Sequence, residues 1–371
     1  FSYRAWDQTD SNANATAGVD VSTNGGSTAY STATETASIG IQPLQVIMYL
    51  STSGDVSVSG APGMDSWDSG EVLAFGDPGT SFGPGTTDGT LYSFLDLRNF
   101  QTGVVDPAID GIHQVSKNTT IGGNGGPSMD LFVGDVLFAI NSNSVQLTGS
   151  DLVEITTDKQ SLYMFRPDTP GDYSAGTFSM VLDNFSTNEV EGISLVEVDT
   201  MVGDTLLQAG TFIYNPGNSR DIFHYTADGV GAGTTSGTTS ILIAGDDINM
   251  NSASAKVSGL DLIESDVNLG STSLSAGNIL VTLDGNDAGV GNNNLAVTSN
   301  DVFYLDVTTT TMGVTNTTSA DAYLLVDGAD LNLDTAAEEI TALSLEVKFG
   351  SGNVDPDISL PGSSINYTEN D

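Results

Sequence analysis

Asp and Asn side chains recur in short polar segments of this sequence, and such segments can supply oxygen ligands to a calcium ion. Ca²⁺ takes roughly six to eight oxygen ligands from carboxylates, amides and backbone carbonyls in flexible loops. The segment that begins at Asp284 starts like an EF-hand loop, but Leu295 occupies the twelfth position, where that loop needs a glutamate. The predicted Ca²⁺ ligands are Asp246, Asp247, Asp284, Asn286, Asp287, Asp327 and Asp330. The alternative is that these residues form turns and face the solvent.

Nucleophilic and transition-metal chemistry find little support. Gly79 to Gly83 matches the G-x-S-x-G pattern, but Pro84 and Gly85 follow where a helix would be needed. The chain has no cysteine and two histidines. His113 stands alone in a stretch that reads as a loop, and His224 occupies a repeat position that holds a tyrosine in the next copy. We therefore predict no catalytic residues, with a surface glycosidase using paired carboxylates as the remote alternative.

The charge balance points to an extracellular setting. The chain carries 48 Asp and Glu residues against eight Lys and Arg, a net charge of −40. Such a surface repels nucleic acid and anionic membranes, and its self-repulsion must be screened by salt or neutralised by bound cations. No apolar run approaches the roughly 20 residues that span a bilayer. We expect an extracellular or cell-surface protein without membrane insertion, supported by Ca²⁺.

An internal repeat is the most informative feature of the sequence. Residues 192–199 align without gaps to 259–266, and residues 241–249 match 324–332. A third copy begins at Ala342, and weaker earlier copies are expected from Gly134 and from Glu71. Short alternating apolar runs separated by Gly, Asp and Asn turns predict antiparallel strands with little or no helix. The predicted fold is all-β, built from tandem antiparallel sandwich-like or propeller-blade-like modules.

These patterns divide the chain into a short N-terminal segment and two β domains. The predicted boundaries are 1–42, 43–190 and 191–371, the last with repeats at 192–258 and 259–341 and a terminal strand segment. The N-terminal stretch FSYRAWDQT…STATETASIGI and the repeats resemble cadherin-like tandem segments of very large bacterial extracellular surface and adhesin-type proteins. The resemblance implies that residues 1–42 are part of a domain cut from a longer precursor. It assigns no activity.

An incomplete β segment with open edges is a template for strand pairing with a neighbour. The first hypothesis is therefore a non-enzymatic subunit of a bacterial surface filament, sheath or layer, assembling with copies of itself or with neighbouring modules by strand complementation. The predicted assembly residues are Phe1, Tyr3, Trp6, Ile39 and Ile41. The second hypothesis is an adhesin stalk or a module that binds surface glycans.

Overall fold

The computed structural model describes residues 44–349 apart from 77–79, 254 and 270–271, together with two short strands near the N-terminus. These strands, β1 (Ser2–Tyr3) and β2 (Glu35–Thr36), pair antiparallel. They belong to a unit made of residues 1–43 and 349–371, whereas residues 44–348 form a second compact unit. In the described chain no helix is long and apolar enough to cross a membrane.

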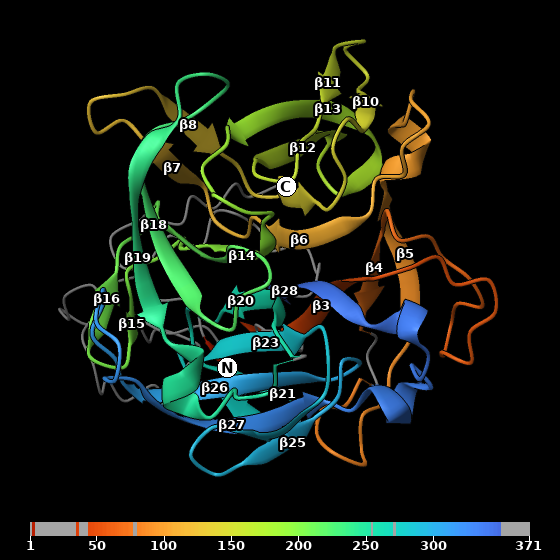
Figure 1. Ribbon diagram of the computed structural model, residues 1–371. Helices are drawn as coiled ribbons and strands as arrows, with labels where there is room; N and C mark the ends of the chain where they lie inside the picture. Colours follow the sequence, from red (N-terminus) through yellow and green to blue (C-terminus); the bar gives the residue numbers. More distant parts are fainter. Residues whose placement is uncertain are drawn as a thin grey trace, which may run out of the picture. The chain divides into compact units, whose positions relative to one another are not determined.

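Four antiparallel four-stranded sheets make up the second unit and are arranged like the blades of a propeller (Figure 1). We number these sheets as blades 1 to 4. Blade 1 contains β28 (Ile340–Phe349), β3 (Leu44–Thr52), β4 (Glu71–Phe75) and β5 (Leu91–Asp96). Blade 2 contains β6 (Ile109–Gln114), β9 (Val136–Ile140), β12 (Leu162–Thr169) and β13 (Asp172–Leu182). Blade 3 contains β14 (Glu191–Leu195), β17 (Phe212–Asn215), β18 (Ile222–Gly229) and β19 (Ser236–Ile243). Blade 4 contains β20 (Val257–Leu262), β23 (Ile279–Leu283), β26 (Val302–Thr309) and β27 (Ser319–Val326).

Small hairpins and turns of 3-10 helix decorate these blades. Between the first and second strands lie β7 (Thr119–Gly122) with β8 (Ser128–Leu131), β15 (Thr200–Val202) with β16 (Thr205–Leu207), and β21 (Val267–Leu269) with β22 (Thr272–Leu274). Between the second and third strands lie β10 (Gln146–Thr148) with β11 (Glu154–Thr156), and β24 (Asp287–Val290) with β25 (Leu295–Val297). The 3-10 turns are η1 (Leu97–Phe100), η2 (Gly245–Ile248), η3 (Gly328–Leu331) and η4 (Ala336–Glu338).

The hydrophobic core is divided into four clusters, each between two adjacent blades. One cluster contains Ile213 of blade 3 and Val281 of blade 4, and another contains Leu73 of blade 1 and Leu280 of blade 4. The remaining clusters join blade 1 to blade 2 and blade 2 to blade 3. Because side chains alternate between the two faces of a strand, each blade buries both faces against its neighbours. The four clusters therefore complete a ring.

Strand β28, from the end of the unit, is the inner strand of blade 1 and lies beside β3. The Ser53 amide donates to the Glu339 carbonyl over 2.9 Å, and the Tyr49 hydroxyl donates to the Glu346 carboxylate. Blade 1 thus combines the first and last parts of residues 44–348, which closes the ring.

The four inner strands β6, β14, β20 and β28 approach one another closely because they carry little or no side chain at one shared position. That position holds Gly111, Gly192, Gly259 and Ala342. A methyl group at Gly192, whose φ is +63°, would lie 3.0 Å from the Leu260 nitrogen. One at Gly259 would lie 3.2 Å from Ala342 Cα. Gly192 thus meets both a left-handed backbone and a close approach, whereas Gly259 meets the close approach alone.

The predicted all-β fold with antiparallel repeats is confirmed. The boundary expected near residue 190 instead falls between two blades of one ring, because the adjacent blades share a hydrophobic cluster. The weaker copies expected from Glu71 and Gly134 do not begin at inner strands, since Glu71 starts β4, the third strand of blade 1, and Gly134 precedes β9, the second strand of blade 2.

Candidate functional site

Residues at the beginning of the four inner strands, the first or the second in each, form the floor of a pocket at one end of the propeller axis. Asp110 of β6 and Glu191 of β14 supply two carboxylates, and Ser258 of β20 and Thr341 of β28 supply two hydroxyls. Each of these residues directly precedes the small residue at which the inner strands touch. The repeat therefore places four polar side chains around one axis.

Bulges in the inner strands help to place these residues. The pairing register shifts between Ile109 and Gly111 in blade 2 and between Val257 and Gly259 in blade 4. Asp110 and Ser258 are the residues left over by these shifts. A bulge leaves one residue outside the ladder and redirects its side chain, which accounts for a carboxylate and a hydroxyl on the axis rather than within a sheet.

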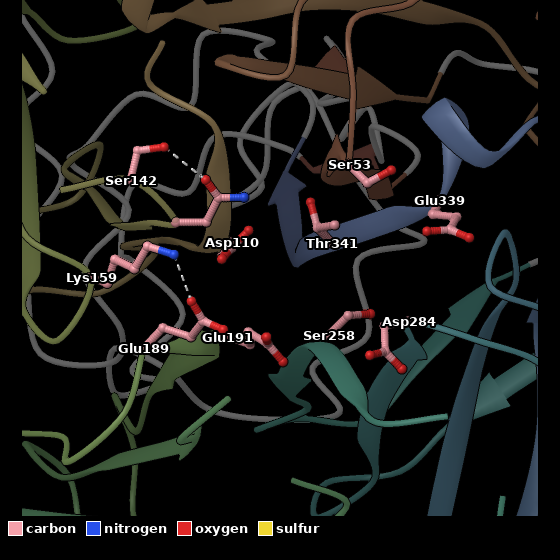
Figure 2. A pocket seen from close by; sticks show the side chains of 11 residues that line it. Ser53, Asp110, Ser142, Lys159, Glu189, Glu191, Ser258, Asp284, Glu339 and Thr341 are labelled. Carbon is pink, nitrogen blue, oxygen red and sulfur yellow. Dashed lines mark hydrogen bonds and ion pairs between the residues drawn. The ribbon is translucent and has the colours of Figure 1, made fainter. Parts of the chain in front are cut away.

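The walls come from segments that flank the inner strands. The pocket has a volume of about 520 Å³. Figure 2 shows the side chains that line it. The charged residues are five carboxylates and one ammonium group, namely Asp110, Glu189, Glu191, Asp284, Glu339 and Lys159. Lys159 Nζ lies 3.0 Å from Glu189. Within the described residues, the other four carboxylates form no ion pair.

Burial without a cationic partner changes the acidity of the pocket. Asp110 is only 6% exposed, and burial followed by the charges of Glu191 and Glu189 raises its pKa well above the ordinary range. The charge of Lys159 and a hydrogen bond with Asn141 act in the opposite direction but do not cancel this rise in pKa. Burial and the Glu189 charge raise the pKa of Glu191 to about 7. A pocket of this kind favours a proton or a ligand cation over free carboxylates.

A buried polar cluster lies on the other side of the glycine positions, and we call it the axial hub. Ser194 Oγ donates to Asp261 Oδ1 over 2.7 Å, and His113 Nδ1 lies 3.3 Å from the same oxygen. His113 Nε2 lies 3.4 Å from Glu197 Oε1. Burial lowers the pKa of His113, but hydrogen bonds to Asp261 and Glu197 outweigh it and raise the pKa to about 10. The imidazolium is thus paired inside the protein.

The hub differs from a nucleophilic triad. A catalytic histidine holds the serine and the carboxylate on opposite ring nitrogens, whereas Ser194 and Asp261 both contact Nδ1 of His113. All three side chains are buried. The expectation that His113 lies in a loop was wrong. His113 lies in the inner strand β6, and its ring contacts Asp261 of the inner strand β20. His224 lies in β18 and is buried, as expected for a strand residue.

Of the predicted Ca²⁺ ligands, Asp284 alone lines the pocket. Asn286 accepts a hydrogen bond from the Ser299 amide, and Asp287 accepts bonds from the Ser252 and Gly289 amides over 3.1 and 3.0 Å. These oxygens stabilise the connection between β23 and β26 and tie it to the segment that precedes β20.

The recurring Asp and Asn residues after the outer strands belong to η2 and η3. Asp247 accepts from the Thr317 and Thr318 amides, and Asp246 pairs with Arg220 at 3.0 Å. Equivalent positions in blade 4 behave similarly. Asp327 caps η3 through the Ala329 amide, and Asp330 accepts from the Thr87 amide over 3.1 Å. Among the described residues, no group of three or more His, Asp or Glu side chains is arranged to hold a metal ion.

The predicted assembly residues Phe1, Trp6, Ile39 and Ile41 lie outside the described residues, and Tyr3 is described only by its backbone pairing with Glu35.

Sequence reasoning missed Asp110, Glu189, Glu191 and Glu339 in the pocket. The available signal was their place in the repeat, because Asp110 and Glu191 each stand just before the glycine of an inner strand. Comparisons with family models, with curated proteins and with solved structures give no match.

Proposed function

We propose that this protein is a non-enzymatic binding module of an extracellular surface assembly, and that its axial pocket binds a multivalent cation. The observation that carries the proposal is Asp110, a carboxylate that is 6% exposed, faces the pocket and has no cationic partner among the described residues. A buried charge needs a counter-charge or a proton. The pocket is large enough for a hydrated metal ion or a chain of amines.

Ca²⁺ is the metal to test first. Asp284, one of the ligands expected from the sequence, lines the pocket, and Ca²⁺ accepts the carboxylate, hydroxyl and carbonyl oxygens found there. An amine such as the lysine side chain of a neighbouring subunit offers the same positive charge. Assembly through residues 1–42 and binding of surface glycans stay predictions from the sequence.

The proposal is tested by calorimetric titration of chelator-treated protein at pH 8 and fixed ionic strength, with CaCl₂, MgCl₂ and spermidine in separate runs. The pocket variant is Asp110→Asn with Glu191→Gln. Its matched control is Asp130→Asn with Glu154→Gln, which removes two exposed carboxylates outside the pocket. We expect at least one cation to bind, and the pocket variant to bind it at least about tenfold more weakly than the control, since about 1.4 kcal/mol corresponds to a factor of ten.

Binding of Ca²⁺ alone would identify a metal site, and binding of spermidine alone would identify an amine site. Absence of binding by all three cations, or equal affinity in the pocket variant and its control, would overturn the proposal.

A further inference from the structure

We propose that two copies of this chain associate through β19, the outer strand of blade 3, by pairing antiparallel along its exposed edge. This inference goes beyond the proposed cation binding and uses different residues. Its basis is that residues 236–240 of β19 form an open and uncharged sheet edge, whereas the outer strands of blades 2 and 4 are covered by hairpins of their own chain.

The hairpins that cover blades 2 and 4 stand between the second and third strands of each blade. In blade 4, the Asn292 amide donates to the Ala320 carbonyl of β27 over 2.8 Å. The Asn293 side chain accepts from the Ala322 amide over 3.0 Å and donates to the Ala322 carbonyl over 2.7 Å. In blade 2, the Ser150 amide donates to a carbonyl of β13 over 2.8 Å. Figure 1 shows β25 beside β27, and β10 and β11 beside β13.

Strand β19 has no such hairpin in its blade, because residues 216–221 alone connect β17 to β18. Gly237 and Thr239 pair with β18 in the same register in which Ala320 and Ala322 pair with β26. Their backbone N–H and C=O groups therefore point away from the blade, as the bonded groups of Ala320 and Ala322 do. Within the described residues, no hydrogen bond to these groups of β19 is formed from outside the blade.

The open edge also carries no charge. The chain has no charged residue between Asp228 and Asp246, and residues 236–239 are exposed. Edge strands are usually protected against pairing by charged side chains, and this part of β19 lacks them. The open part ends where the Ile241 carbonyl accepts from the Gly313 amide over 2.8 Å. Because the chain has a net charge of −40, two copies repel each other over most of their surface, and an uncharged edge is a place where they can meet.

The sequence of this edge fits a second copy of itself. A two-fold axis places the same surface on both subunits. With Thr238 on that axis, Gly237 lies opposite Thr239 of the partner subunit, and the two residues exchange both of their outward backbone hydrogen bonds. Thr238 then lies opposite its own counterpart, and Ser236 lies opposite Ser240 of the partner subunit. Cross-strand pairs of Thr and Ser are favourable, so the pairing satisfies the open backbone groups without opposing charges.

The test is sedimentation velocity of the full chain over a series of protein concentrations, at about 0.15 M and about 0.5 M NaCl. A chelator is present throughout, so that metal binding in the axial pocket does not contribute. We expect an equilibrium between monomer and dimer that shifts toward the dimer at the higher salt concentration, because salt screens the repulsion between the two acidic copies.

Thr238→Asp places two carboxylates opposite each other on the axis, and we expect it to weaken the dimer at least about tenfold. The matched control is Thr156→Asp, which adds the same charge at an exposed position of β11 and should associate like the wild type. An equimolar mixture of Thr238→Asp and Thr238→Lys should associate more tightly than Thr238→Asp alone, since opposite charges then meet on the axis. Circular dichroism checks that each variant is folded, and the exposed Ser236→Asp is a second variant with the same expected weakening.

A wild-type chain that stays monomeric at both salt concentrations would overturn this inference. So would a dimer that the β19 variants and Thr156→Asp weaken equally, because the interface would then lie elsewhere. Both results leave the proposed cation binding standing, since no residue of the pocket takes part in the experiment.

Discussion

Gly192 tests whether close contact between the inner strands builds the axis. We consider Gly192→Ala, which adds one methyl group at a backbone φ of +63°. That methyl would lie 3.0 Å from the Leu260 nitrogen and 3.1 Å from Gly259 Cα, and both are backbone atoms of the next inner strand. Neither can move without moving β20.

Two costs combine at this position. A non-glycine residue in the left-handed region costs about 1–2 kcal/mol, and overpacking a tight interior costs about 1–3 kcal/mol. We therefore expect Gly192→Ala to lower the free energy of unfolding by about 2–5 kcal/mol. At the equivalent position of the fourth inner strand stands Ala342, so only one of the four positions carries a Cβ atom.

Gly171→Ala is the matched control. Gly171 has φ of +84°, and nothing lies within 4 Å of an added methyl group. This variant carries the backbone strain of about 1–2 kcal/mol without a steric clash. Both variants are compared with the wild type by urea unfolding, followed by circular dichroism at fixed salt. Equal losses in the two variants would refute the idea that backbone contact between inner strands defines the axis.

Two further variants address charged groups in and beside the axial hub, where the half-buried Glu264 accepts hydrogen bonds from the Glu197 and Val198 amides. Burial raises the pKa of Glu264 from its ordinary value of 4.5 to about 7, so the folded state binds the proton more tightly than the unfolded state, and stability falls as pH rises through this window. Relative to Glu264→Gln, the wild type should lose about 3 kcal/mol of unfolding free energy between pH 5 and pH 8. Unfolding free energies of the two proteins that change in parallel with pH would contradict this. His113→Gln leaves Asp261 and Glu197 without their cation and should cost about 3–5 kcal/mol at pH 7. The pKa of His113 is raised from 6.5 to about 10. The difference in unfolding free energy between the wild type and His113→Gln should therefore be largest below pH 6.5 and be lost as pH rises through 10. A difference that stays constant up to about pH 11 would argue against the paired imidazolium.

Much of the fold follows from the repeat, because strands of the same blade lie close in the sequence and share turn residues. The pairing of β28 with β3 does not follow, since it joins residues 297 positions apart, such as Tyr49 and Glu346. Periodicity identifies Ala342 as the start of a new copy but cannot say that the remaining strands of that copy lie near residue 44. Ring closure depends on contacts between blades, which local patterns do not contain.

The recurring Asp and Asn residues show why a repeated polar motif is weak evidence for a metal site. Asp247 and Asp327 accept backbone hydrogen bonds at the turns that follow the outer strands. Asn249 and Asn332 end these turns in the left-handed conformation, with φ of 57° and 54°. Asn tolerates that conformation better than most residues, so turn geometry explains the repetition. The pocket residues vary among the copies, and only the ring brings them together.

Buried carboxylates are paired with a cationic side chain at one end of the axis but not at the other. In the axial hub, His113 lies between Asp261 and Glu197, so the negative charges there have a cation built into the fold. Across the glycine positions, Asp110 and Glu191 form no ion pair within the described residues, and the charge of Lys159, which is paired with Glu189, offsets their pKa shifts only in part. The two other floor positions hold Ser258 and Thr341 rather than a lysine or arginine. Buried carboxylates without a counter-charge lower stability unless a proton or a ligand neutralises them. This contrast between the two ends of the axis is the observation on which the proposed cation binding rests.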